Sequence, residues 1–333
     1  MAVFAASGVM RRRASSARIG WVLRGALFAV LAAAMPFHAA FGAEPDWVKG
    51  RRFTVAFAQD NLANDWRAAQ VRQLREALEP YPFIAFGHSD ARGDAARQVR
   101  DMEDFIARRV HVLVTSPQDP ERARPILALA AKARIPVVLL SRTVPGGEFT
   151  SFIAPDNTEI GRQAARFLAE RTKTRTRVVI LQGLPTSTAA IERTEGFREE
   201  LSRHAHLGIA ALKPANYLRA DALRAMEDIL AAKIPFDAIY AQSDSMAIGA
   251  RVALRQAGID PASIPTVGID YIQESRAAIR AGEQTASFLL PTGAKEGAEI
   301  ILRILKGETV PKTVVIPSQL VTRDNVERVE PIF

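Results

Sequence analysis

The sequence predicts an α/β fold built from two doubly wound lobes with parallel sheets. Short apolar segments alternate with amphipathic segments of helical length along most of the chain. The alternation runs once before about residue 150 and starts again after it, and 333 residues are enough for two domains with cores of their own. Polar residues repeatedly follow the apolar segments, as expected at the carboxyl ends of parallel strands.

The first half is expected to form one complete domain. Its predicted strands are 51–59, 83–88, 110–116 and 135–143, and its predicted helices are 65–80, 94–109 and 120–134. In the second of these helices, Val99, Met102 and Ile106 repeat at helical spacing. Strands that alternate with helices of this length indicate a parallel sheet.

The second half repeats the architecture without a detectable sequence repeat. Its predicted strands are 150–157, 178–183, 208–215, 237–244, 265–270 and 285–291, and its predicted helices are 158–171, 189–198, 221–233, 245–258, 273–282 and 294–307. The tail at 312–333 is expected to be a short strand and an irregular return.

The most informative stretch is 178–198, where VVILQG predicts a buried strand, LPTST a loop and AAIERTEGFR a helix. The hydroxyl residues at 186–188 can cap that helix. Arg193 then lies one to two turns into the helix, near the carboxyl end of the strand, and is the first candidate for a ligand contact. The alternative is a solvated arginine paired with Glu192 or Glu195.

The N-terminus has the order of a secretory signal peptide, which we assign to residues 1–43. A segment with five arginines and no acids comes first, and the apolar run GALFAVLAAAMPF at 25–37 follows it directly. The small-residue stretch at 39–45 comes next. We expect cleavage near Gly42 or Ala43, and an uncleaved anchor is the alternative. Removal of the segment lowers the net charge from +8 to +3, so the basic composition does not indicate nucleic-acid binding.

Composition and motifs also argue against other function classes. Because the chain has no cysteine, disulfides, thiol nucleophiles, Cys-ligated zinc and a lipoprotein anchor are excluded. Ser187 does not lie in a nucleophile elbow, and the loop that contains it lacks the Gly-Lys-Ser/Thr of a phosphate-binding loop. We therefore expect no enzyme activity.

Polar and aromatic residues that follow the predicted strands form the candidate site, since two facing sheet edges would make a cleft. They are Asn64, Trp66, Arg67, Ser141, Arg142, Arg193, Tyr217, Ser243 and Asp270. Asp156, Asn157 and Asp244 occupy similar places but are also suited to cap the helices that follow them. For Trp66 the alternative is a place in the core.

Six stretches, in order, resemble one family. They are DWRAAQ at 65–70, VVLLSRT at 137–143, APDNTEIGR at 154–162, VVILQGLPTSTAAIERTEGF at 178–197, IYAQSDSMAIGA at 239–250 and VGID at 267–270. The chain is similar over residues 52–320 to the periplasmic pentose- and hexose-binding proteins of ABC importers, which are related to ribose-binding protein. It is most similar to the galactofuranose-binding branch.

The resemblance implies a type I periplasmic binding protein fold, in which two Rossmann-like lobes joined by a three-stranded hinge close on one sugar. The lobes would comprise 44–154 plus 291–318 and 155–290 plus 319–333. No metal or cofactor is expected. Trp66 and Tyr217 would give aromatic walls, the arginines would donate to the ligand, and Asp270 would accept hydrogen bonds from hydroxyl groups.

Three positions depart from the family's usual pattern: Ser141 stands where an acid is common, Ser243 where asparagine is, and Leu289 where glutamine or glutamate is. With Leu289 the candidate site has ten residues. The loss of the acid before Arg142 leaves three candidate arginines against Asp270. We expect a ligand with fewer hydroxyl groups or with an acidic group. The alternative is an ordinary sugar whose missing contacts are replaced by water and rearranged neighbours.

The leading functional prediction is a monomeric periplasmic receptor that delivers a sugar or sugar-like ligand to an ABC permease in the inner membrane. The second is a sensor that reports the ligand to a membrane histidine kinase or chemoreceptor. The third, a ligand-controlled DNA-binding repressor, would need a helix-turn-helix headpiece, and residues 1–50 have the pattern of an export signal instead.

Overall fold

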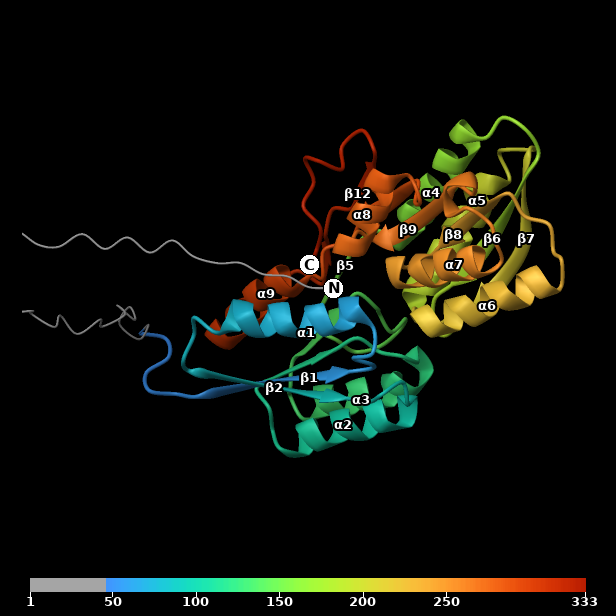
Figure 1. Cartoon of the computed structure of the whole chain (residues 1–333). Coiled ribbons are helices and arrows are strands. Elements are labelled where there is room, and N and C mark those ends of the chain that lie inside the picture. The colour runs from blue at the N-terminus through green and yellow to red at the C-terminus, as the bar shows by residue number, and fades with distance from the viewer. Residues whose placement is uncertain (1–45) are drawn as a thin grey trace, which may run out of the picture. The chain divides into compact units, whose positions relative to one another are not determined.

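The computed structural model describes residues 46–333, which lie in one compact unit, Glu44–Phe333. The signal peptide that we assign to residues 1–43 lies outside the described residues. Two six-stranded sheets form the unit (Figure 1), and the predicted α/β fold with two lobes is confirmed. No helix in the described part of the chain is both long enough and apolar enough to span a membrane.

The first sheet is wholly parallel. Its spatial order is β11 (Thr313–Val315), β5 (Ser151–Ala154), β4 (Val137–Leu140), β3 (Val112–Thr115), β1 (Phe53–Gln59) and β2 (Ile84–Asp90). Its helices are α1 (Asp65–Leu78), α2 (Ala95–Ala107), α3 (Pro120–Lys132) and α9 (Ala294–Lys306). We call this sheet with its helices the first lobe.

The second sheet, with its helices, is the second lobe. Its spatial order is β12 (Gln319–Thr322), β10 (Ala286–Leu289), β9 (Thr266–Asp270), β8 (Ala238–Ala241), β6 (Thr176–Gln182) and β7 (Leu207–Pro214). Its helices are α4 (Asn157–Arg171), α5 (Thr188–Leu201), α6 (Arg219–Ala231), α7 (Asp244–Gln256), α8 (Gln273–Ala281) and the short 3₁₀ helix η1 (Pro261–Ser263). Unlike the expected all-parallel sheet, it has one antiparallel pair, because β12 returns alongside β10.

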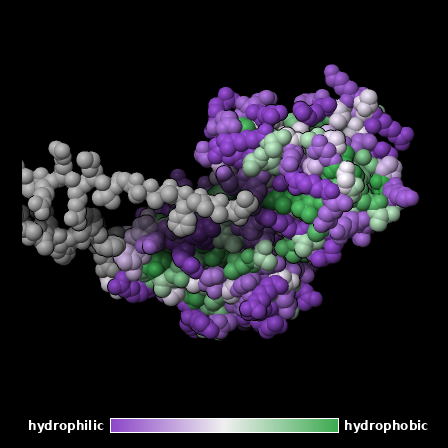
Figure 2. Space-filling model, in the orientation of Figure 1, coloured by the Kyte–Doolittle hydropathy of each residue, from purple (hydrophilic) through white to green (hydrophobic). Residues whose placement is uncertain are grey.

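Both sheets are buried on both faces, which explains their near-continuous apolar strands. In β1, Val55 and Phe57 pack on the side of α1 and α9, whereas Ala56 and Ala58 pack on the side of α2 and α3. Figure 1 shows α1 on one side of β1 and β2, and α2 and α3 on the other. The outer surface in Figure 2 is largely hydrophilic over both lobes.

The chain passes between the two sheets three times in the described residues. It crosses after β5, after β10, and between β11 and β12. The crossings at 155–156 and 290–293 lie next to residues that line the cavity described below. Three short connections are an arrangement that permits hinge motion between the lobes.

Helices α4 and α5 approach each other closely because each has a glycine that faces the backbone of the other. A Cβ atom added to Gly196 would lie 2.0 Å from the carbonyl oxygen of Thr158, and one added to Gly161 would lie 2.3 Å from that of Arg193. Both distances are far below any real contact, so only glycine allows this packing. The close approach fixes α5, and with it Arg193, against α4.

We expect Gly196→Ala to lower the free energy of unfolding by about 1–3 kcal/mol, because the added methyl group must push the two helices apart. Gly208→Ala is the matched control, since no atom lies within 4 Å of the Cβ position in that strand residue. Urea unfolding of both variants beside the wild type measures the effect. Equal stabilities for the two variants would show that the helices separate without cost.

Candidate functional site

Residues that follow strands of both sheets line one cavity of about 380 Å³. Eight of the ten residues predicted from the sequence are on its wall: Asn64, Trp66, Arg67, Ser141, Arg193, Tyr217, Ser243 and Asp270. Pro155, Asn157, Ala189 and Leu290 complete the lining. Polar side chains separated by up to about two hundred positions in the sequence thus converge on one cavity.

Arg193 is 4 % exposed and is held from two sides. Its Nε donates to Oδ1 of Asn157 at 2.9 Å, and its Nη1 donates to the carbonyl oxygen of Gln242 at 2.8 Å. No hydrogen bond joins its Nη2 to any of residues 46–333. The structure therefore contradicts the alternative of a solvated arginine paired with Glu192 or Glu195 and leaves one nitrogen available to a ligand.

Arg67 is anchored by hydroxyl groups rather than by an acid alone. Its Nη1 donates to Oγ of Ser116 and of Ser141, each at 2.7 Å, while Asp60 lies 3.7 Å from its Nε. Burial, reinforced by the nearby charge of Arg142, lowers the pKa of Arg67 to about 9. Ser141 is thus part of the support for Arg67.

Arg142 does not line this cavity but lines an adjoining one together with Asp60. Its Nη1 donates to Oδ2 of Asp60 at 2.7 Å, and its guanidinium lies 5.5 Å from the ring centroid of Tyr217. The sequence therefore overstated the charge imbalance: Asp60 supplies a carboxylate for Arg142 from another strand. Asp60 directly follows β1, so the rule used for the other residues would have included it.

Asp270 is a buried carboxyl group, 4 % exposed, at the end of β9. Burial raises the pKa of Asp270 well above its ordinary value, the charge of Asp244 raises it further, and Arg193 partly offsets both. The pKa of Asp244 is also raised by burial. Asp270 and Arg193 line this side of the cavity, and the carboxyl group of Asp244 lies behind it.

Asp244 is not the helix cap. Ser243 takes that role by accepting from the backbone N–H of Met246 at 3.2 Å. Oδ2 of Asp244 instead accepts from the backbone N–H of Tyr271 at 2.7 Å and from Oγ of Ser287 at 2.7 Å. The buried carboxyl group thus fixes the backbone just after Asp270, and it supports the cavity without lining it.

Three residues on the cavity wall have left-handed backbone. The φ angles are 61° for Ser141, 64° for Tyr217 and 116° for Asp270. Such conformations cost about 1–3 kcal/mol each in residues with a side chain. They turn the chain sharply at the ends of the strands, which places these side chains in the cavity.

Asn64 and the two aromatic residues shape the wall. Oδ1 of Asn64 caps α1 by accepting from the backbone N–H of Arg67 at 3.0 Å, and its Nδ2 donates to the carbonyl oxygen of Tyr217 in the other lobe at 2.8 Å. The indole N–H of Trp66 donates to the carbonyl oxygen of Leu290 at 2.9 Å. Trp66 packs in a core cluster and also lines the cavity, so both interpretations of this residue hold.

Leu289 does not line this cavity either. Its side chain packs with Tyr271 and Val321 in a separate apolar cluster, and the neighbouring Leu290 lines the cavity instead. The reason is that successive side chains of an extended segment point to opposite sides: Phe288 and Leu290 share one cluster, and Leu289 faces the other. Asn157, which we expected mainly to cap a helix, orients Arg193, and Asp156 provides the cap.

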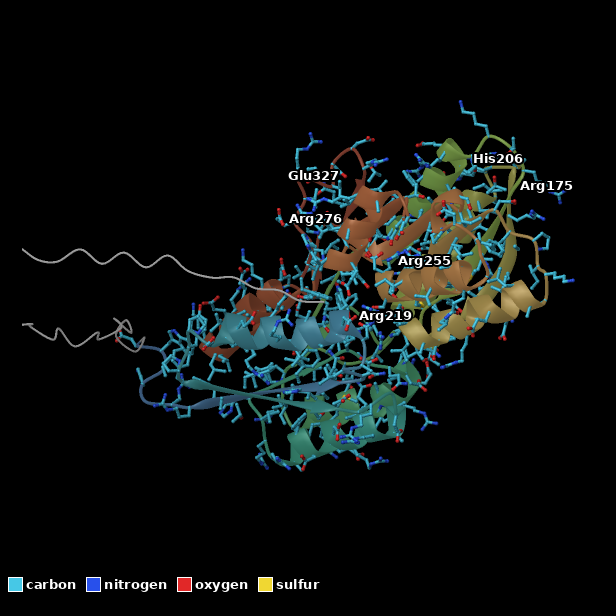
Figure 3. The ribbon with its side chains drawn as sticks, in the orientation of Figure 1. Arg175, His206, Arg219, Arg255, Arg276 and Glu327 are labelled. Carbon is cyan, nitrogen blue, oxygen red and sulfur yellow. The ribbon has the colours of Figure 1, made fainter. Side chains whose placement is uncertain are left out.

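Polar contacts join the two lobes around the cavity. The hydroxyl of Thr186 donates to the carbonyl oxygen of Gln118 at 2.9 Å, and the backbone N–H of Thr143 donates to the hydroxyl of Thr188 at 3.1 Å. Arg219, labelled in Figure 3, pairs with Asp65 of α1 at 2.9 Å. Within residues 46–333, no group of three or more His, Asp or Glu side chains is arranged to hold a metal ion.

The chain matches a family model described as a periplasmic binding protein domain over residues 55–309. It is 32% identical over 237 residues to the ribose import binding protein RbsB of Salmonella typhimurium, covering 70% of this chain and 79% of that protein. The stated resemblance to ribose-binding proteins is therefore confirmed.

Solved structures show the same similarity. The structure of a galactofuranose-binding protein is similar to this chain, with 26% sequence identity and a TM-score of 0.79. The similarity covers 83% of this chain and 96% of that protein's chain. A fructose-binding periplasmic domain of a hybrid two-component system is also similar, with 27% sequence identity and a TM-score of 0.79. That similarity covers 83% of this chain and 92% of the domain's chain.

Replacing Asp270 by Asn tests the buried carboxyl group. A group whose pKa is raised by folding binds more protons when folded, so its stabilising contribution is complete below its unfolded pKa near 4 and is lost as the pH rises toward the folded pKa. We expect the stability of D270N relative to wild type to increase with pH in that window, by up to about 1.4 kcal/mol per unit. Urea unfolding between pH 4 and 7 measures the difference. A difference independent of pH would contradict the raised pKa.

Proposed function

Because this chain belongs to the family of periplasmic binding protein domains, we propose that it captures a sugar or sugar-derived ligand between its lobes and delivers it to an ABC permease. The observation that carries this proposal is the convergence of two aromatic and several polar side chains from both lobes on one small cavity. The ligand is bound and released without chemical conversion, and no cofactor takes part.

Each part of the cavity suits part of a sugar. Trp66 and Tyr217 offer apolar ring surface to the C–H groups of the ligand, while their polar atoms are bonded elsewhere. Arg67 and Arg193 offer donors whose geometry is fixed by bonds to neighbouring groups. Asp270 accepts from hydroxyl groups, which discriminates against ligands that lack them.

The charge of the cavity favours an acidic sugar derivative. Two guanidinium groups, Arg67 and Arg193, face one carboxyl group, Asp270, whose pKa is raised by burial. A carboxylate on the ligand would balance this excess through a charge-assisted bond to the free Nη2 of Arg193. The hydroxyl groups of Ser141 and Ser243 already accept hydrogen bonds, from Arg67 and from the backbone N–H of Met246. They are therefore less available to bind hydroxyl groups of the ligand, which supports the same proposal.

Closure of the lobes is the mechanical part of the proposal. A ligand that contacts both lobes stabilises the closed arrangement in proportion to its extra contacts there. The division that we propose is 44–154 plus 291–318 for one lobe and 155–290 plus 319–333 for the other. The protein acts as a monomer in the periplasm, after removal of residues 1–43.

A second candidate function is a sensor that reports the ligand to a membrane kinase. The similarity to the fructose-binding domain of a two-component system favours it. The two functions share the cavity and differ in the partner that recognises the closed form.

We expect a sugar, polyol or sugar acid to raise the melting temperature of the chain from residue 44 onward, since it binds the folded state only. Arg193→Ala should abolish the shift, because it removes a buried donor on the cavity wall. Arg198→Ala, an exposed arginine on the same helix, is the matched control. A thermal-shift panel measures both. A shift that survives Arg193→Ala would place the ligand elsewhere.

The acidic preference has its own test. We expect ribonate and galacturonate to bind at least about tenfold more tightly than ribose and galactose, because one charge-assisted bond contributes about 1.5–3 kcal/mol. Isothermal titration with the four compounds measures the ratios. Sub-micromolar binding of ribose or galactose, with no binding of the sugar acids, would refute the preference and leave the binding function intact.

A further inference from the structure

Tyr271 directly follows Asp270 and is fully buried. Its hydroxyl donates to the carbonyl oxygens of Val329 at 3.0 Å and Val326 at 3.2 Å. Its own carbonyl oxygen accepts from the backbone N–H of Ile332 at 3.0 Å. Tyr271 does not line the cavity that we assign to the ligand, so any effect that it has on binding must pass through a neighbour.

These bonds hold the chain where its backbone is strained. The φ angle is 116° for Asp270 and 57° for Tyr271, so two consecutive residues with side chains adopt left-handed backbone. Such a conformation persists only where the surrounding structure holds it. The N–H of Tyr271 is bonded to Asp244 and Ser287. Its carbonyl and hydroxyl groups are bonded to the segment 326–333, which we call the C-terminal strap.

The C-terminal strap is itself fastened to helices of both lobes. Arg276 of α8, labelled in Figure 3, pairs with Glu330 at 2.7 Å. Gln73 of α1, in the first lobe, donates through its Nε2 to the carbonyl oxygen of Ile332 at 3.2 Å. The side chain of Ile332 packs against the core cluster that contains Trp66. Contacts from both lobes therefore fix the strap against which Tyr271 is held.

We propose that Tyr271 is a positioning residue, which together with the C-terminal strap holds the carboxyl group of Asp270 in place for the ligand. This inference rests on the proposed function, in which Asp270 accepts hydrogen bonds from the ligand. Loss of the Tyr271 hydroxyl frees the ring from the strap, and the strained backbone can then relax and move the carboxyl group. Because coupling between two sites is reciprocal, a ligand bound at Asp270 also stabilises the bonds of the strap.

A double-mutant cycle tests whether Tyr271 acts through Asp270. Isothermal titration with D-ribose, D-galactose, ribonate and galacturonate is carried out on the wild type, Tyr271→Phe, Asp270→Gly and the double variant. Glycine removes the carboxyl group and accepts the left-handed backbone. We expect Tyr271→Phe to weaken the tightest-bound of the four compounds about tenfold. In the Asp270→Gly background it should weaken that compound less than about twofold, because the group that it positions is gone.

Tyr240→Phe is the matched control. Tyr240 is a fully buried tyrosine of β8 in the same lobe, and its hydroxyl has no hydrogen-bond partner within residues 46–333. This variant removes the same atom from a buried ring without releasing the strap, so it should bind the four compounds as the wild type does.

Hydrogen exchange on the wild type is a second measurement that needs no variant. A saturating amount of the tightest-bound compound should slow exchange of the Ile332 amide, which bonds Tyr271. We expect this slowing to be at least about fivefold greater than that of the Ser263 amide, which bonds Asp260 beside the short helix η1. Nuclear magnetic resonance resolves the two amides.

The outcomes separate the positioning role from the proposed function. The positioning role would be overturned, and the sugar-binding function would stand, if Tyr271→Phe bound like the wild type, lost affinity equally in both backgrounds, or lost no more than Tyr240→Phe. Equal slowing of exchange at Ile332 and Ser263 would also overturn it, and this measurement decides alone if a variant fails to fold or to bind. Absence of binding of all four compounds to the wild type would overturn the sugar-binding function and the positioning role with it.

Discussion

Desolvation of arginine side chains is the constraint on which the structure between the lobes depends. Arg67, Arg142 and Arg193 are each at least nine-tenths buried at the ends of the strands. A buried guanidinium group destabilises the fold unless its N–H donors are hydrogen-bonded. The three arginines differ in the groups that accept these bonds. Asp60 pairs with Arg142, hydroxyl groups hold Arg67, and neutral oxygens hold Arg193. The hydrogen bonds of Arg193 therefore go to neutral groups, and the buried carboxyl group of Asp270 is the nearby acid on the same cavity wall.

The same logic explains why so much backbone strain is tolerated here. The left-handed residues at the ends of β4 and β9 would relax if their neighbours allowed it. The buried Asp244 prevents this after β9, because it holds the backbone N–H of Tyr271 and is itself bonded by Ser287 and Gln284. A site fixed before the ligand arrives loses little conformational entropy on binding.

The sequence predicted the elements and the convergence of the site well, because strand ends in a parallel sheet follow from periodicity alone. It did not predict pairings that depend on side-chain direction. Asp60 and Arg142 are 82 positions apart, and nothing local distinguishes an arginine that faces an acid from one that faces a cavity. Leu289 was predicted in the place of Leu290 for the same reason: the two neighbouring side chains point to opposite sides, and the sequence does not say which side faces the cavity.

The closure of the lobes that we propose depends on a balance of small energies. Neutral hydrogen bonds such as Asn64 to Tyr217 and Thr186 to Gln118 each contribute about 1 kcal/mol net, and the exposed pair of Arg219 with Asp65 contributes less. Burial of the cavity's charged groups opposes them. The two arrangements can then differ by only a few kcal/mol without ligand. Because a shift from 1:99 to 99:1 takes about 5.5 kcal/mol of preferential binding, a few bonds to both lobes suffice to close them.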